Sequence, residues 1–349
     1  MKCQNVVLDT CVVFNILKYS HLYETQGEAA FYNYLNQKKQ DMLATEEQIK
    51  QYLPNSLKNK TGEPFEKTVR LYMVNLNGTI GKLKREAGKY RTMLEQGIYY
   101  KNGQVIPVTL TSEERKELEQ EYKNKTALLK KLRQKYGAIN KLLYGEKGKK
   151  GYFDKIDRTQ PGILFEKYLK GELKFHVVKT SYKEILNHID GLGNAKHKID
   201  PKMIYPFLKR CTLISTNSKE IETYIEQLAE RFRRNAKSGA VEMAEDINSL
   251  NEYGDSKIMA EANLAGMPLV TANGKDFIYS SKDKTYDGIR RHINNVTQKF
   301  YPKTTSALAY TPGEIIAGAY NQNITASTML KELPQGQAKN AEFADEITL

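Results

Sequence analysis

The stretch of sequence that decides the fold is residues 254–277, GDSKIMAEANLAGMPLVTANGKDF. Its apolar spacing predicts a helix over 255–265, and the run MPLVT predicts a buried strand over 267–271. Near the N-terminus, residues 5–10 (NVVLDT) predict another strand, which ends at Asp9. Short, continuous apolar strands are typical of a parallel sheet that is covered on both faces. The chain is therefore expected to be an α/β protein.

Four carboxylates stand beside the predicted strands: Asp9, Glu184, Asp255 and Asp276. Each comes just after a strand or at the start of a neighbouring helix. In an open parallel sheet these positions share one edge, where ligands bind. We expect the four side chains to converge there, where their mutual repulsion would call for a cation. Carboxylate oxygens suit Mg²⁺ or Mn²⁺.

Each carboxylate also has an explanation that involves no catalysis. Asp9 and Asp255 stand where an N-cap residue would begin the next helix. Ser181 and Glu184 have the Ser-x-x-Glu spacing of a capping box. Asp276 lies in a predicted turn. The position of all four at one edge of the sheet favours a shared site over four separate caps.

The α/β alternation continues through the second half of the chain. The further expected elements are a first helix at 10–18, a strand at 175–179, a helix at 181–189, a strand at 211–215, a helix at 218–236, a strand at 306–310, and a short helix that begins with Pro312 at its first position. This order is typical of a mostly parallel sheet.

A long segment separates the first two predicted strands, far more than a crossover between parallel strands needs. Apolar residues with three-and-four spacing predict two helices in it, over 65–94 and 118–143, packed as an antiparallel helical hairpin. The segment therefore looks like an insertion with a structure of its own.

Two turns and a tail complete the segment-by-segment prediction. Residues 98–106 contain Asn-Gly between apolar residues, which predicts a small β-hairpin at the tip of the helical hairpin. The Gly-rich, basic residues 145–151 predict a mobile loop. Residues 331–349 are polar and without periodicity, and are expected to be disordered.

The charge of the chain is unevenly distributed. Its 349 residues carry a formal net charge of +13, which favours polyanionic partners, chiefly nucleic acid. Solubility alone is the simpler explanation. Between Ser20 and Lys174 there are 30 Lys and Arg residues against 19 Asp and Glu, a net charge of +11. Partner contact is therefore expected to centre in this segment.

The same sequence argues against several other classes of protein. No apolar run reaches the roughly 18 residues of a transmembrane helix, and the N-terminus lacks a secretory pattern. The cysteines (Cys3, Cys11 and Cys211) form no Cys-x-x-Cys pair, and the five histidines follow no metal-binding motif. A reducing, cytoplasmic setting is expected.

Cations alternate with tyrosines in the basic segment, and this pattern suits single-stranded nucleic acid. Aromatic rings can stack on unpaired bases while Lys and Arg contact phosphates. Tyrosines on the predicted helix seams are better explained as core. The contact candidates are Tyr99, Tyr100, Lys147, Lys149 and Lys150, with a second set at Arg231, Arg233 and Arg234, where cations also favour the helix dipole.

Taken together, these motifs resemble those of PIN-domain nucleases. The resemblance rests on Asp9 after its apolar strand, on residues 181–184 and above all on residues 254–277, with 309–314 looking like the closing strand and helix of that family. It covers 1–18 and about 165–320. It implies a Rossmann-like α/β/α fold with a mostly parallel central sheet. It also implies hydrolysis of phosphodiester bonds, usually in RNA, with Mg²⁺ or Mn²⁺ as cofactor.

The family's site residues carry over position by position. Asp9, Glu184 and Asp255 match its three core acidic residues, with Asp246 as a less well placed substitute for Asp255. Asp276 is the candidate for the fourth, because Asn273, at the other position that the family uses, is uncharged. Thr10, Thr271 and Asn273 resemble the polar residues beside the family's site.

The expected organisation is a discontinuous nuclease core over 1–19 and 160–330, an inserted basic helical arm over 20–159 and the tail over 331–349. The insertion departs from the family, whose members are typically compact single domains. The arm is expected to bind RNA. Family members also suggest a homodimer and, for a toxin, a neutralising antitoxin-like partner. Toxin, antiphage defence and RNA maturation all stay open as roles.

The leading interpretation is a metal-dependent endoribonuclease. The first alternative is a catalytically inactive RNA-binding or scaffold protein on a PIN-like fold, motivated by the large arm and by the uncharged Asn273. The second is a structure-specific DNA nuclease with related metal chemistry.

Overall fold

The computed structural model describes residues 3–58, 64–101, 103–190, 199–215, 219–237, 254–273, 277–278, 288–300 and 308–318. The chain divides into two compact units. Unit 1 comprises Met1–Gln40, Gly62–Pro64 and Ile156–Leu349, and unit 2 comprises Asp41–Thr61 and Phe65–Lys155.

Unit 1 contains a five-stranded sheet with the strand order β7-β6-β1-β8-β9. Every pairing in it is parallel. The strands are β1 (Gln4–Leu8), β6 (Leu173–Val178), β7 (Thr212–Ile214), β8 (Leu269–Val270) and β9 (Ala309–Tyr310). The predicted α/β class and the parallel sheet are confirmed, with most strands shorter than expected.

The two central strands are buried on both faces, as their apolar sequences predict. Val6 and Leu8 of β1 and Phe175 of β6 belong to one large core cluster with side chains from helices of the same unit. The alternate residues Val7 and Val178 are fully buried as well. Because successive side chains of a strand point to opposite faces, both faces of the sheet are covered.

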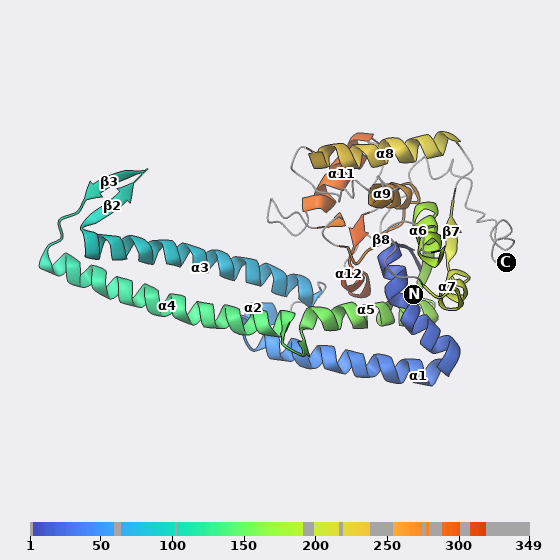
Figure 1. The fold of residues 1–349 in the computed structure, drawn as a ribbon, viewed down its shortest axis with the longest axis horizontal. Helices are drawn as coiled ribbons and strands as arrows, with labels where there is room; N and C mark the ends of the chain where they lie inside the picture. The colour runs from blue at the N-terminus through green and yellow to red at the C-terminus, as the bar shows by residue number, and fades with distance from the viewer. Residues whose placement is uncertain are drawn as a thin grey trace. The chain divides into compact units, whose positions relative to one another are not determined.

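The helices of unit 1 connect these strands. They are α6 (Lys179–Asp190), α7 (Pro201–Leu208), α8 (Lys219–Lys237), α9 (Gly254–Leu264), α11 (Gly288–Phe300) and α12 (Pro312–Ile316), together with parts of α1 (Thr10–Lys50) and α5 (Tyr152–Leu169). Helix α8 packs along α9 and α11 (Figure 1). Among the described residues, no helix is both long and apolar enough to cross a lipid bilayer.

The prediction that the first helix ends at residue 18 is wrong. Helix α1 continues to Lys50 and is interrupted at Gly27, whose φ of 83° lies in the left-handed region that glycine tolerates. Beyond this kink, Phe31 and Leu35 are fully buried in the core cluster. Tertiary burial therefore extends a helix whose local sequence gave little sign of continuing.

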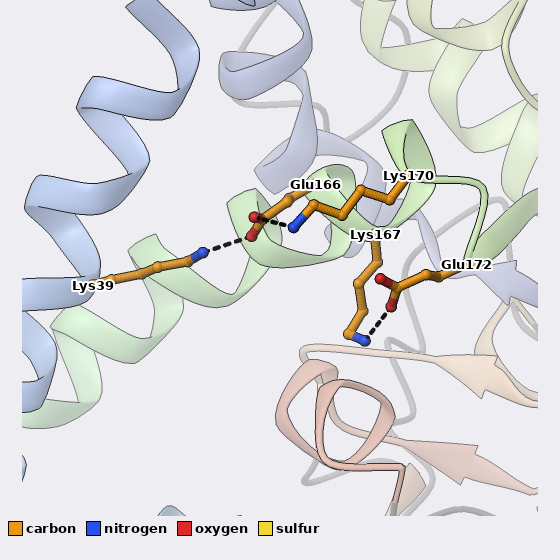
Figure 2. A network of polar contacts seen from close by, with 5 residues as sticks. All are labelled: Lys39, Glu166, Lys167, Lys170 and Glu172. Carbon is orange, nitrogen blue, oxygen red and sulfur yellow. Dashed lines mark hydrogen bonds and ion pairs between the residues drawn. The ribbon is translucent and has the colours of Figure 1, made fainter. Parts of the chain in front are cut away.

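A polar network ties α1 to α5 within unit 1 (Figure 2). The Glu166 carboxylate accepts hydrogen bonds from Lys39 at 2.5 Å and from Lys170 at 2.7 Å. Burial of Glu166 alone would raise its pKa, but the bonds from Lys170 and Lys39 outweigh burial and lower it. Beside it, Lys167 donates to Glu172 at 2.6 Å. The network fixes the end of α5 that leads into β6.

Unit 2 is mainly a pair of long helices. Its elements are α2 (Asn55–Lys58), α3 (Phe65–Gln96), β2 (Ile98–Lys101), β3 (Gln104–Pro107), α4 (Ser112–Tyr144), β4 (Gly145–Glu146) and β5 (Lys149–Lys150). Helices α3 and α4 pack against each other, with the β2–β3 hairpin joining them (Figure 1). The two helices and the hairpin were expected from the sequence. Their role as a substrate-binding arm stays a prediction.

Residues 145–151, predicted as a mobile loop, form a short β-hairpin instead. Strands β4 and β5 form an antiparallel pair in which Gly145 faces Lys150. Gly145 has a φ of 83°, and a Cβ atom there would lie 2.2 Å from the Lys149 carbonyl oxygen. The glycines that suggested mobility therefore permit a close approach of two backbones.

His176 on β6 is expected to contribute a loss of stability on acidification. Its Nε2 lies 3.1 Å from the Asn5 Oδ1, its Nδ1 has no hydrogen-bond partner among the described residues, and burial lowers its pKa to about 4. The unfolded state, with a pKa near 6.5, binds the proton first, so stability present at neutral pH is lost as the pH falls. We expect His176 alone to contribute a loss of about 2 kcal/mol between about pH 7 and pH 5.

Urea unfolding of the wild type and of His176→Gln at both pH values measures this effect. The difference in unfolding free energy between the wild type and His176→Gln is expected to change by about 2 kcal/mol between the two pH values. This difference isolates His176 from Glu184 and Glu261, whose raised pKa values act in the opposite direction. An unchanged slope in His176→Gln would show that His176 is not the group responsible.

Candidate active site

The chain segment after β1 carries the first predicted acid into the centre of the sheet. Strand β1 pairs with β8, and the Asp9 N–H donates to the Val270 carbonyl oxygen at 3.0 Å. The Asp9 side chain is therefore held beside the end of β8 and is 4% exposed. There its Oδ2 accepts a hydrogen bond from the fully buried Thr271 hydroxyl at 2.7 Å.

Thr271 is itself oriented by the chain that follows it. The Asn273 N–H donates to its hydroxyl oxygen at 2.9 Å, which leaves the hydroxyl proton for Asp9. A third contact comes from Cys11, whose thiol donates to the Asp9 Oδ2 at 2.8 Å. The Asp9 carboxylate is thus held by donors from two separate strand ends.

The second predicted acid lies beside the first. Thr10 donates to the Glu184 Oε2 at 2.6 Å, across 174 positions of sequence. The prediction that Thr10 and Thr271 stand next to the acids is consistent with these contacts. The capping-box explanation for Glu184 is not observed, since α6 begins at Lys179 and the buried Ser181 hydroxyl has no partner among the described residues.

The two acids influence each other electrostatically. Burial raises the pKa of the Glu184 carboxyl to about 7, the bond from Thr10 lowers it, and the negative charge of Asp9 raises it further. A cation that bound there at neutral pH would therefore compete with a proton for these oxygens. Two carboxylates with two hydroxyls are hard oxygen donors, the type that Mg²⁺ and Mn²⁺ prefer.

The structure describes only one of the remaining predicted acids, Asp255. Asp255 lies in the first turn of α9, a helix that contacts α6, β6 and β8. Asp276 and Asp246 lie outside the described residues. Among the residues described, no group of three or more His, Cys, Asp or Glu side chains is arranged to hold a metal ion. A metal site of more than two carboxylates stays a prediction.

The predicted nucleic-acid contacts are distributed over both units. In unit 2, Tyr100 on the β2–β3 hairpin is 54% exposed, and Lys147, Lys149 and Lys150 are exposed on the β4–β5 hairpin. Tyr99 is half-buried, with Lys89 5.8 Å from its ring. In unit 1, Arg231 is exposed on α8, while the side chains of Arg233 and Arg234 lie outside the described residues.

Sequence reasoning missed Cys11. Besides its bond to Asp9, its sulfur accepts from the Ala272 N–H at 3.4 Å and lies 3.8 Å from the Thr271 hydroxyl. Burial, and then the charge and hydrogen bond of Asp9, raise the pKa of the thiol well above its usual range. The only signal in the sequence was its position two residues after the acid.

This environment predicts an unreactive thiol. Only the thiolate reacts with alkylating reagents, so Cys11 is expected to be modified at least about tenfold more slowly than the exposed Cys3. Timed alkylation followed by peptide mass spectrometry measures both rates in one sample. Asp9→Asn, which removes the neighbouring charge, should speed the reaction of Cys11 and leave that of Cys3 unchanged. Equal rates at Cys3 and Cys11 in the wild type would contradict the described contacts.

Comparisons with known proteins do not decide the family. No protein-family model matches the chain, and no curated protein or solved structure matches it either. Membership of the PIN-domain nucleases therefore stays a proposal based on the residues above.

Proposed function

We propose that this protein is a metal-dependent endoribonuclease with a PIN-like, Rossmann-type core. The observation that carries the proposal is the pairing of Asp9 and Glu184, joined through Thr10, beside the carboxyl ends of β1 and β8. Ligand sites of open parallel sheets gather at this edge. Helix capping does not explain why Glu184 is directed toward Thr10 instead of its own helix start.

The residues present suit Mg²⁺ or Mn²⁺. Asp9 and Glu184 would hold the ion, and Asp255 and Asp276 are proposed to complete the set. When bound, the ion neutralises phosphate charge and lowers the pKa of a coordinated water. The protein's own contribution is orientation: Thr271 and Cys11 hold the Asp9 carboxylate, and Thr10 holds that of Glu184. Because these buried contacts hold the two carboxylates in place, little reorganisation of the site would be needed during the reaction.

RNA is proposed as the substrate because of the charge and the exposed aromatic residues of unit 2. The exposed Tyr100 can stack on an unpaired base, and Lys147, Lys149 and Lys150 can contact phosphates. In this proposal unit 2 is the inserted arm that captures substrate.

The test is a cleavage assay with the full chain. Labelled single-stranded RNA, structured RNA and DNA are incubated with Mg²⁺, with Mn²⁺ and with EDTA. Cleavage of RNA that requires the metal supports the proposal, and cleavage of DNA alone would replace it with the DNA nuclease. Binding of RNA without any cleavage would favour the inactive scaffold.

A further inference from the structure

Unit 1 contains a hollow beside α6, the helix that carries Glu184. It lies between α6, the end of β7, α8 and α9 and has a volume of about 320 Å³. Among the described residues, none of the acids proposed for catalysis lines it. This volume is at the lower end of the range for pockets that enclose small ligands. The hollow therefore has the size of a site for one small group, such as a single nucleotide.

Its walls combine aliphatic side chains with lysines and glutamates. Ile214, Ile221, Ile225 and Leu264 supply an apolar surface from β7, α8 and α9. Aliphatic walls of this kind can enclose the flat faces of a nucleobase. A fully polar cleft would suit a free anion. Against this lining, the burial of an apolar ring is also favourable.

Three lysines line the hollow: Lys179 and Lys183 from α6 and Lys257 from α9. Lys179 donates to Glu222 at 2.7 Å, and the charges of Lys183 and Lys257 lower the pKa of that same carboxyl further. The three cations therefore act on one small region, where Lys257 also lies 3.6 Å from the Glu226 carboxylate. Lys183 is exposed and stands next to Glu184 in sequence, where it can reach a phosphate.

Three acids also line the hollow, Glu222, Glu226 and the half-buried Glu261. Glu261 of α9 accepts a hydrogen bond from the Thr180 N–H at 3.2 Å. Burial raises its pKa to about 7, although the bonds from Thr180 and the charges of Lys179 and Lys257 lower it. A carboxyl group can accept from the amino groups of a base edge, and in its neutral form it can also donate.

We propose that this hollow binds one nucleotide of the RNA strand, with the phosphate on Lys183 and Lys257 and the base between the aliphatic walls, where Glu261 contacts its edge. The inference rests on the proposed function, because it takes RNA as the substrate and places a neighbouring nucleotide beside the cleavage site. In this inference, residues of α6, α8 and α9 determine which base the protein prefers.

Binding can be measured without catalysis. Isothermal titration of the full chain in EDTA with AMP, GMP, CMP, UMP and inorganic phosphate as probes is expected to show at least one nucleotide bound about tenfold or more tightly than phosphate. Ala265→Phe, which fills the hollow, should abolish this difference. Lys183→Glu, at an exposed position that tolerates charge, should weaken nucleotide binding about tenfold.

Two controls separate the outcomes. Lys202→Ala removes an exposed lysine of α7 that does not line the hollow, and it should leave nucleotide binding unchanged. Thermal melting shows whether Ala265→Phe is folded, and Lys183→Glu provides the result if it is not. If no nucleotide binds better than phosphate, or if Lys183→Glu and folded Ala265→Phe both bind like the wild type, the inference is wrong.

Failure of this inference can be distinguished from failure of the proposed function. If the wild type cleaves RNA but binds no nucleotide more tightly than phosphate, the proposed active site is supported and the nucleotide pocket is ruled out. If the protein binds a nucleotide and Ala265→Phe weakens this binding, but the protein cuts no nucleic acid, the nucleotide pocket is supported and the nuclease function is ruled out. If both hold, Glu261→Gln should change the base preference at cleavage sites, while Asp9→Asn should leave nucleotide binding intact.

Discussion

Asp9→Asn is expected to lower the rate of RNA cleavage in Mg²⁺ by about a thousandfold, which corresponds to about 4 kcal/mol of lost transition-state stabilisation. The amide removes the negative charge that would hold the cation, yet it keeps an oxygen that can accept from Thr271 and Cys11. The fold should therefore survive while the chemistry is lost. Single-turnover cleavage of labelled RNA, with a melting curve for each variant, measures both.

The matched control is the same chemical change at Asp200. That carboxylate caps α7 by accepting from the Lys202 N–H at 2.9 Å, and asparagine caps a helix equally well. Asp200→Asn should cleave like the wild type. Full activity of Asp9→Asn would rule out the proposed site. An equal loss of cleavage activity in both variants would indicate a general effect on folding.

Glu314→Gln is expected to destabilise the protein by about 3–5 kcal/mol, the usual cost of leaving one partner of a buried ion pair uncompensated. The Arg290 Nη2 donates to the Glu314 Oε2 at 2.6 Å, and their side chains are only 10% and 2% exposed. Arg290 also donates to the Ala309 carbonyl oxygen of β9 at 2.9 Å. The pair thus joins α11 to the edge strand and to α12.

The chain offers a close control for this substitution. Glu314 forms a capping box with Thr311, and Glu114 forms the same motif with Thr111 at the exposed start of α4. Glutamine can replace glutamate in a capping box, so Glu114→Gln should hardly move the denaturation midpoint. If the two substitutions have equal effects in urea unfolding, the buried charge of Arg290 is not what makes Glu314 important.

Local sequence was a good guide wherever a pattern repeats over several residues. The helices α3 and α4 were predicted from three-and-four spacing, and the β2–β3 hairpin between them from Asn-Gly. The start of α12 was predicted from Pro312 at its first position, and Thr311 and Glu314 do form a capping box there. These features depend on interactions between near neighbours, which a short window contains.

The errors have a common physical cause. The first helix was ended at residue 18 because the local pattern weakens there, whereas Phe31 and Leu35 extend it by packing in a core assembled from distant segments. Residues 145–151 were expected to be mobile, yet Gly145 lets β4 and β5 approach closely. In both cases, contacts with residues outside the local window decided the conformation.

The same division applies to the candidate site. The sequence by itself determined which residues can be ligands, since the apolar strand before Asp9 and the strand before Thr271 set where those side chains emerge. Only the tertiary structure decided that Glu184 meets Thr10, that Cys11 donates to Asp9, and that Glu261 lines a separate hollow. Strand periodicity is a local property of the backbone, whereas these contacts depend on the parallel pairing of strands far apart in the chain.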